Sequence, residues 1–327
     1  MTDAEILDRF PNLSALVIGD ICLDRWCRYD PAMAEASRET GIPRIAVTAT
    51  EVTPGAGGTV ANNLIALGAG RVAVLGAIGA DGFAFELTQG LKQRGISANL
   101  LIEVPAMQTF TYTKLINMES GAEDRPRVDF ITNAPLHPDV ERRILERILT
   151  VFEDFDIILI SDQAETHLGG IVTPGVRALL ADLAPNYPEK VFVADSRTRI
   201  DLFRNILLKP NQHEAGIACR KLFGRIDYPA LREHVSAKVL MVTHGAEGVL
   251  VVDADGEKWV RTKPVEHPVD ICGAGDSFSA GMSLALAATG SPARAAEFGN
   301  RVASITIMKP GTGTASPREI LESVSCK

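Results

Sequence analysis

A single carboxylate, Asp276, directly follows the small residues Gly273, Ala274 and Gly275 near the end of the sequence. Apolar residues after this segment recur at helical spacing, so we expect the small residues to begin a helix. Unpaired amides at a helix start form a site suited to phosphate. A carboxylate there can accept a proton from a hydroxyl while the amides stabilise charge on a transferring phosphoryl group. The alternative is that Asp276 only caps the helix.

A second polar pair, Asn211 and Glu214, is separated by three positions and follows a strand-like apolar segment at 206–208. On a helical turn the two side chains share a face, where an amide and a carboxylate can orient waters around Mg²⁺ near a nucleotide phosphate. An Asn N-cap with Glu at the third helical position is the competing interpretation. Farther along, a strand-to-turn segment that can pass beneath nucleotide phosphates contains Thr243, Gly245 and Gly248.

The N-terminal half carries a polar segment after an expected buried strand at 15–19 and, later, a glycine-rich turn before a helix. Asp24 follows that strand, and ligands of open parallel sheets bind at the carboxyl ends of strands. Asp24 is therefore a candidate for substrate contact, or else a loop residue paired with Arg25. The turn with Gly55, Gly57 and Gly58 leads into a helix and suits close approach of a polyol or phosphate, or simply permits a tight turn.

Strands and helices alternate regularly after residue 134. We expect helices near 138–153 and 173–183 and strands at 157–161, 191–195, 239–243 and 249–253. This rhythm predicts an α/β fold with a mostly parallel central sheet covered by helices on both faces. Extended segments at 42–53, 98–105, 109–117 and 127–131 fall outside the rhythm. We expect one domain, 1–327, with a small β-sheet lid drawn from about 21–53 and 98–131 that excludes water from the site.

The overall composition limits the classes of partner. A net charge of −8, without a basic run, argues against nucleic acid. Five scattered cysteines are typical of reduced thiols, and neither a signal peptide nor an apolar run long enough to span a membrane is indicated. We therefore expect a cytoplasmic protein. P-loop, Rossmann, zinc-protease and serine-hydrolase motifs are missing, whereas the features of phosphoryl transfer are present.

Taken together, these segments resemble the ribokinase (PfkB) family of sugar kinases over nearly the entire sequence. The resemblance rests on ordered segments at 19–24, 55–68, 209–214, 243–248 and 270–276. It implies a ribokinase-like fold, with Asp276 as catalytic base and 273–275 as the anion hole. It also implies ATP and Mg²⁺ as cofactors, a homodimer formed through the lid, and specific ligand sites. These sites are Asn211 and Glu214 for Mg²⁺ through water, Thr243, Gly245 and Gly248 for ATP, Asn300 near adenine, and Asp270, Ile271 and Gly311 for a monovalent cation such as K⁺.

Within this family the N-terminal half looks most like the heptose-7-phosphate 1-kinase branch, through residues 19–26, Lys114 and the segment that begins at Arg127. Kinases of that branch are often fused to a nucleotidyltransferase domain, and here we expect the kinase alone. Thr59 stands where relatives usually carry Asn, so sugar recognition is expected to differ. The substrate-binding candidates are Asp24, Gly55, Gly57, Gly58, Thr59, Lys114, Arg127 and Asp162.

The expected activity is thus ATP-dependent phosphorylation of a hydroxyl on a sugar or sugar phosphate. Two alternatives stay open at this point. One is a nucleoside kinase or other small-molecule kinase on the same fold, and the other is a sugar or nucleotide sensor without catalysis.

Overall fold

A nine-stranded sheet forms the centre of the protein in the computed structural model, which describes residues 1–164 and 169–325. Its strand order is β13-β12-β11-β10-β9-β8-β1-β4-β5, and the seven strands from β11 to β5 run parallel, as the sequence predicts. The strands are β1 (Ser14–Gly19), β4 (Arg71–Gly79), β5 (Ser97–Val104), β8 (Ile157–Asp162), β9 (Val191–Ser196), β10 (Leu207–Leu208), β11 (Leu240–Thr243), β12 (Val249–Asp253) and β13 (Gly256–Val260).

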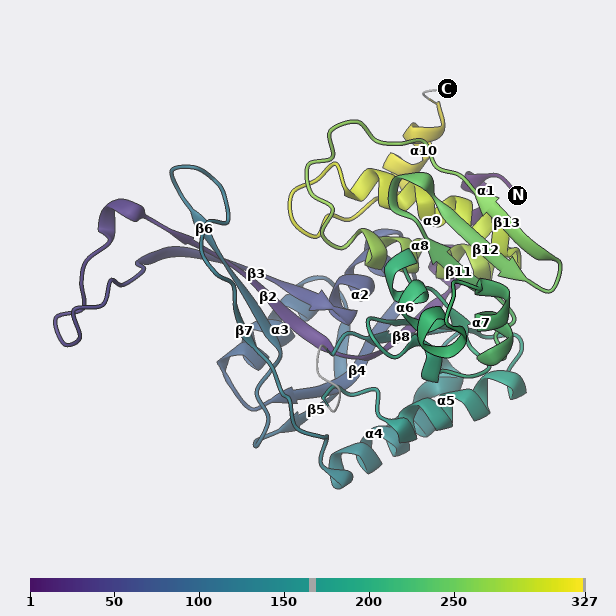
Figure 1. The fold of residues 1–327 in the computed structure, drawn as a ribbon, viewed down its shortest axis with the longest axis horizontal. Helices are drawn as coiled ribbons and strands as arrows, with labels where there is room; N and C mark the ends of the chain where they lie inside the picture. Colours follow the sequence, from purple (N-terminus) through teal and green to yellow (C-terminus); the bar gives the residue numbers. More distant parts are fainter. Residues whose placement is uncertain (165–168, 326–327) are drawn as a thin grey trace.

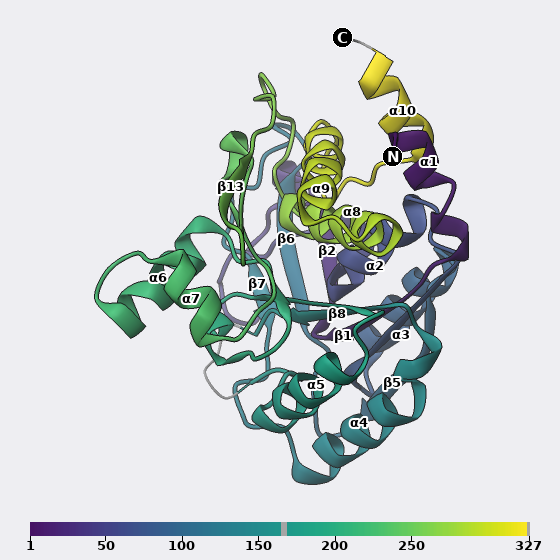
Figure 2. The same ribbon diagram turned by 90° about the vertical axis from the view of Figure 1, so that its right-hand side faces the viewer.

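Helices cover both faces of this sheet (Figure 1, Figure 2). One face packs against α1 (Asp3–Leu7), α2 (Gly57–Ala66), α3 (Gly82–Gln93), α8 (Ala274–Thr289), α9 (Pro292–Thr306) and α10 (Pro317–Ser325). The other packs against α4 (Pro138–Val151), α5 (Pro174–Asn186), α6 (Gln212–Phe223) and α7 (Tyr228–His234). Successive side chains of a strand point to opposite faces, so Val17 of β1 joins the first core and Leu16 the second. The predicted α/β fold class is confirmed.

A second sheet of four strands, in the order β3-β2-β6-β7, extends from the body as a long arm (Figure 1). It consists of β2 (Ile21–Tyr29), β3 (Val47–Ala56), β6 (Thr111–Asn117) and β7 (Val128–Phe130). The segments at 109–117 and 127–131 therefore contribute to a separate small sheet, as predicted. The residues that follow β1 form the strand β2, which pairs with β3 on one side and β6 on the other.

One part of the lid prediction is wrong. The segment at 98–105 corresponds to β5, which pairs in parallel with β4 at the edge of the main sheet. Its Ile102 side chain is buried in the core on the α4 side of the sheet, and this burial explains the extended, apolar character of the segment. The small sheet draws its second pair of strands from β6 and β7 alone. Within the described residues, the helices are all too short or too polar to cross a membrane.

Candidate active site

Two cavities meet where β8 and β9 end and α8 begins. The smaller has a volume of about 150 Å³ and lies against the small sheet. The larger, of about 690 Å³, lies between the starts of α6 and α8 and the loop after β13. Gln163, Arg197, Gly273 and Asp276 line both cavities. A group bound in one cavity can therefore reach a group bound in the other at Asp276.

The start of α8 has the geometry expected for an anion site. Gly273 is the N-cap and adopts a left-handed backbone with φ +76°, which glycine adopts without strain. Asp276 is the third helical residue, and no hydrogen bond reaches its carboxylate from the residues described here, so it does not cap the helix. The Ala274 amide donates to the Ile271 carbonyl at 3.2 Å. The amides of Gly275 and Asp276 lie in the first turn, where a helix offers no acceptor.

The surroundings of Asp276 favour its protonated form. Burial, followed by the negative charge of Asp195, raises the pKa of Asp276 to about 7, although the Lys209 cation opposes the shift. A carboxyl group that titrates near neutral pH is suited to accept a proton from a hydroxyl. The predicted position of Asp276 beside a glycine-rich helix start is thus accompanied by the electrostatics of a general base.

The smaller cavity collects polar side chains from the small sheet and from the ends of β8 and β9. Asp24 of β2 lies in its wall, and burial raises the pKa of Asp24 to about 6 against the opposing charges of Lys114, Arg127 and Arg197. Asp24 does not pair with Arg25, whose Nε lies 3.1 Å from a Glu86 oxygen. The cavity is lined by Asp24, Arg25, Trp26, Ala56, Thr59, Tyr112, Lys114, Arg127, Gln163, Arg197, Cys272, Gly273, Asp276 and Thr312.

The glycines before α2 allow the backbone to lie close to the smaller cavity. A Cβ atom at Gly55 would lie 2.5 Å from Asp24 Oδ1, and one at Gly57 would lie 2.7 Å from Ile21 Cδ1. Gly58 is similarly packed, since a Cβ there would lie 2.6 Å from Pro54 Cβ. Thr59 lines the cavity, and its hydroxyl donates to the Pro54 carbonyl at 3.2 Å. Its Oγ1 thus retains only acceptor capacity toward a ligand.

The structure does not support the prediction that Asp162 contacts substrate. Asp162 is buried, lies outside the linings of both cavities and forms an ion pair with Arg199. Its Oδ2 also accepts hydrogen bonds from Ser196 Oγ at 2.6 Å and Arg199 Nε at 3.0 Å. The carboxylate is therefore fully engaged within the protein. The next residue, Gln163, is the one that faces the cavities.

The predicted nucleotide-site residues Asn211, Glu214, Thr243, Gly245, Gly248 and Asn300 all line the larger cavity. Asn211 and Glu214 form a capping box at the start of α6, in which Glu214 Oε2 accepts from the Asn211 amide at 2.8 Å. Burial and the charge of Asp195 raise the pKa of Glu214. The capping interpretation is therefore confirmed, and the same carboxylate also faces the cavity. Asn300 Nδ2 donates to the Val260 carbonyl at 3.0 Å.

The residues predicted to bind a monovalent cation also converge. Asp270 Oδ2 accepts from the Gly311 amide at 3.1 Å, and Asp270 Oδ1 accepts from the Cys272 amide at 2.9 Å. The Ile271 side chain is exposed, while the Ile271 backbone carbonyl accepts a hydrogen bond from the Ala274 amide. In the described chain, no three acidic, His or Cys side chains are grouped closely enough to hold a metal by themselves. Any cation here would depend on backbone carbonyls and this one carboxylate.

Comparison with known proteins agrees with this geometry. Residues 14–319 match the pfkB family carbohydrate kinases. The chain belongs to this family. Two relatives are each called Bifunctional protein HldE: that of Pelobacter propionicus is 29% identical over 98% of this chain, and that of Geobacter sulfurreducens 30% identical over 95%. The chain spans 65% and 63% of their respective lengths, or less than two thirds.

Solved structures show the same fold. Ribokinase from Thermotoga maritima superposes with a TM-score of 0.70 at 20% identity, covering 96% of this chain and 99% of that protein. Phosphofructokinase-2 from Escherichia coli, in complex with substrates and products, also gives 0.70, at 22% identity, covering 96% and 98%. The pfkB carbohydrate-kinase assignment thus rests on the family match and is supported by the architecture.

Several residues of this pfkB kinase site were missed by the sequence analysis. Asp195, Arg197 and Lys209 line the larger cavity, together with Gln163. Asp195 and Arg197 occur where β9 ends, and Gln163 follows β8. The rule that ligands bind at the carboxyl ends of parallel strands, which selected Asp24, would have selected these residues as well.

Proposed function

We propose that this pfkB carbohydrate kinase transfers the γ-phosphoryl group of ATP to a hydroxyl of a phosphorylated sugar, with heptose 7-phosphate as the favoured acceptor. The observation that carries the proposal is the charge around the smaller cavity. Among the described residues, four cationic side chains, Arg25, Lys114, Arg127 and Arg197, line it beside two carboxylates, Asp24 and Asp276. Arginine and lysine are the usual ligands of phosphate, whereas a neutral sugar needs no such excess.

The small sheet contributes Arg25, Lys114 and Arg127, and the last two belong to its β6–β7 side. Lys114 belongs to β6, and its Nζ is 3.8 Å from a Glu123 oxygen, a distance that leaves the pair weak. Arg127 lies just before β7, pairs with Asp129 at 2.6 Å and stacks on Tyr112 with its guanidinium carbon 5.0 Å from the ring centre. An acceptor with its phosphate at this end would extend its reacting hydroxyl toward Asp276 and the junction of the cavities.

The reaction assigns one task to each group. The acceptor oxygen forms a bond to the γ-phosphorus while the bond from that phosphorus to the β–γ bridging oxygen breaks, and ADP leaves with the electron pair. Asp276 takes the proton of the hydroxyl, and the first-turn amides of α8 donate to the phosphoryl oxygens. The small sheet covers the acceptor and excludes water.

Mg²⁺ fits the residues of the larger cavity. Glu214 and Asp195 are two carboxylates close enough for the charge of Asp195 to raise the pKa of Glu214, and a divalent cation would relieve this repulsion. The bound ion would neutralise charge on the nucleotide phosphates. Glu214 would hold it through water, with Asn211 orienting the same waters.

We also propose a K⁺-type cation beside Asp270, Ile271 and Gly311; a structure of the E. coli phosphofructokinase-2 named above is in complex with potassium.

The test is a screen for ADP release with purified protein, ATP and Mg²⁺. The acceptors are heptose 7-phosphate, fructose 6-phosphate, ribose, fructose, ketodeoxygluconate and a nucleoside. We expect turnover with a phosphorylated sugar and a kcat/KM at least about tenfold above that of any unphosphorylated one. Preference for a nucleoside would support the nucleoside-kinase alternative. Tight ATP binding without ADP release from any acceptor would support the sensor.

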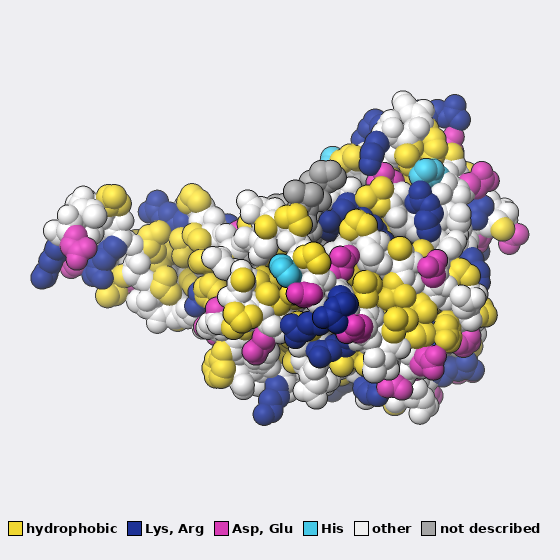
Figure 3. All heavy atoms as spheres, turned by 90° about the horizontal axis from the view of Figure 1, so that it is seen from below, with side chains coloured by type: hydrophobic (Ala, Val, Ile, Leu, Met, Phe, Trp, Pro, Cys, Tyr) yellow, Lys and Arg dark blue, Asp and Glu magenta, His cyan; other side chains and the backbone are white. Residues whose placement is uncertain are grey.

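We propose that the small sheet also mediates a homodimer. Several large hydrophobic side chains on this arm and its connections are exposed, and Figure 3 shows hydrophobic groups gathered along it. They are Met33, Ile42, Ile45, Val47, Met118, Val128 and Ile131. Exposed apolar surface of this kind is typical of interfaces. Sedimentation of the wild type and of an Ile42→Glu variant would test this, since the variant is expected to be monomeric.

We further propose a cytoplasmic location, supported by the cysteines. Cys22, Cys27, Cys219 and Cys272 are free thiols in the part of the chain that the structure describes. Free thiols persist where the compartment is reducing. Cell fractionation with a tagged chain would check this location.

A further inference from the structure

The side chains of Arg197 and Gln163 form a pair at the junction of the two cavities, and neither was selected from the sequence. Both residues line the acceptor side and the nucleotide side. Arg197 Nε donates to Gln163 Oε1 at 2.9 Å, and the Arg197 amide donates to the Asp162 carbonyl at 3.2 Å. Hydrogen bonds therefore hold both the backbone of Arg197 and its guanidinium group.

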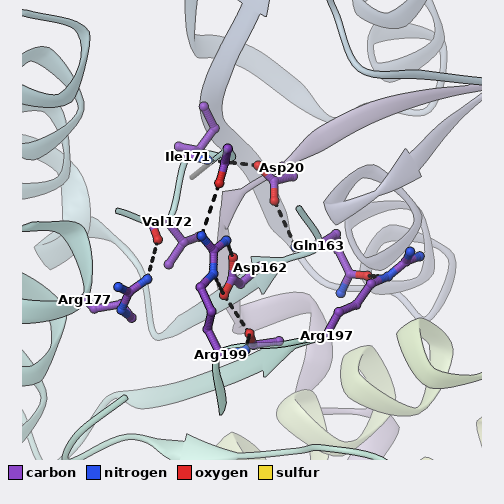
Figure 4. A network of polar contacts seen from close by, with 10 residues as sticks. Asp20, Asp162, Gln163, Ile171, Val172, Arg177, Arg197 and Arg199 are labelled. Carbon is purple, nitrogen blue, oxygen red and sulfur yellow. Dashed lines mark hydrogen bonds and ion pairs between the residues drawn. The ribbon is translucent and has the colours of Figure 1, made fainter. Parts of the chain in front are cut away.

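Two arginines separated by one residue have opposite surroundings here (Figure 4). Arg199 is buried and forms an ion pair with Asp162, and its Nη1 donates a hydrogen bond to the Gly169 carbonyl at 3.1 Å. Arg197 is exposed to the cavities and lies beside Gln163. Arg199 is thus part of the structural framework, whereas Arg197 lines both cavities.

The framework beneath this pair is a buried polar network. Asp20, at the end of β1, accepts hydrogen bonds at 2.9 Å from the amides of Gln163 and Ile171. Asp162 and Arg199 connect the end of β8 to the segment after β9. Because these bonds fix the backbone of Gln163 and of residues 196–199, the Arg197 side chain starts from a rigid base.

We propose that Arg197 is a catalytic residue that stabilises the charge of the phosphoryl group in transit between the two cavities, and that Gln163 is the positioning residue for its guanidinium. This inference rests on the proposed kinase function. The bonds made and broken are those given above: the acceptor oxygen bonds to the γ-phosphorus, ADP departs with the electron pair and the proton passes to Asp276. Arg197 neither gains nor loses a proton in this step, since guanidinium stays protonated throughout.

Charge and geometry both favour this role. In phosphoryl transfer, negative charge spreads over the equatorial oxygens of the transferring group, and a guanidinium fork can donate to two of them at once. The charge of Arg197 acts on both sides of the junction, since it is among the influences that lower the pKa of Asp24 and of Asp276. An arginine that served only the acceptor or only the nucleotide would line one cavity.

The test compares Arg197→Met, Arg197→Lys and Gln163→Met with the wild type, using the best acceptor from the ADP-release screen. We expect Arg197→Met to lower kcat about 10²- to 10³-fold with small changes in KM, and Arg197→Lys and Gln163→Met to lower it about tenfold. Added guanidinium chloride at low millimolar concentration should restore part of the activity of Arg197→Met but not of Gln163→Met. The acid limb of the kcat/KM profile of Arg197→Met should move to higher pH.

Arg199→Met is the matched control for folding. It leaves Asp162 buried without its partner, so we expect a loss of thermal stability that Arg197→Met does not show. If Arg197→Met keeps kcat within about twofold of wild type, or loses kcat only in parallel with its melting temperature and without guanidinium rescue, the role of Arg197 is overturned. If Arg197→Met does not fold, the kcat of Arg197→Lys and Gln163→Met decides: wild-type values overturn the role. An inactive wild type would instead overturn the proposed function, and this inference with it.

Discussion

The Lys209 ammonium lies 2.7 Å from Asp195 Oδ2 in the wall of the larger cavity, and both charges act on Asp276. Burial alone would lower the pKa of Lys209, but Asp195, with Glu214 and Asp276 nearby, raises it. Lys209 therefore stays cationic at neutral pH. Burial is the main cause of the raised pKa of Asp276, and the repulsion of Asp195, only partly offset by Lys209, adds to it.

The pH dependence of activity follows from this raised pKa. Because the pKa of Asp276 is raised to about 7, the base is protonated and inactive below that pH and becomes competent above it. We expect kcat/KM, measured at saturating Mg²⁺ with one acceptor, to rise about tenfold per pH unit below about pH 7 and to level off above it. A profile that is flat down to about pH 5 would rule out Asp276 as the base with this pKa.

Glu214→Gln separates the capping role of this residue from its proposed metal role. Glutamine can still accept the Asn211 amide in a capping box, so the melting temperature should change little. The charge is lost, and we expect the Mg²⁺ concentration for half-maximal activity to rise about 10- to 100-fold. The measurement is a Mg²⁺ titration of the rate at fixed ATP. An unchanged titration with unchanged stability would mean that Glu214 only caps α6.

Lys114→Met tests recognition of the acceptor phosphate. The Lys114 ammonium has only a distant partner in Glu123, so removing it should cost little stability. We expect KM for the phosphorylated sugar to rise about 10- to 100-fold, while KM for ATP stays the same. Lys92→Met, on the exposed side of α3, is the matched control and should match the wild type. Equal effects on phosphorylated and unphosphorylated sugars would contradict a phosphate contact.

The sequence identifies the local motifs of the site better than the contacts that strand pairing creates. Gly273 to Asp276, and Asn211 with Glu214, are local motifs in which the residues that act together are neighbours in the chain, so their spacing reveals them. Arg197 and Gln163 meet only because β8 and β9 pair in parallel, and that contact has no local signature.

The two errors have the same physical origin. Asp162 is the last residue of β8, yet its carboxylate points to Arg199, a partner that spacing does not disclose. Residues 97–104 are extended like the strands of the small sheet, but their pairing with β4 is decided by burial of Ile102 in the core. Strand propensity shows that a segment is extended, and only tertiary packing shows which sheet it joins.

Asp276→Asn tests the central claim most directly. The amide cannot accept the proton but keeps the size of the side chain, so ATP affinity measured by calorimetry should stay within about threefold of wild type while kcat falls about 10²- to 10⁴-fold. Because the raised pKa means that the ionised carboxylate costs stability above about pH 7, the variant should melt at the same or a higher temperature at alkaline pH. Asp255→Asn, at an exposed turn, should match the wild type. Near-wild-type turnover of Asp276→Asn would contradict the account.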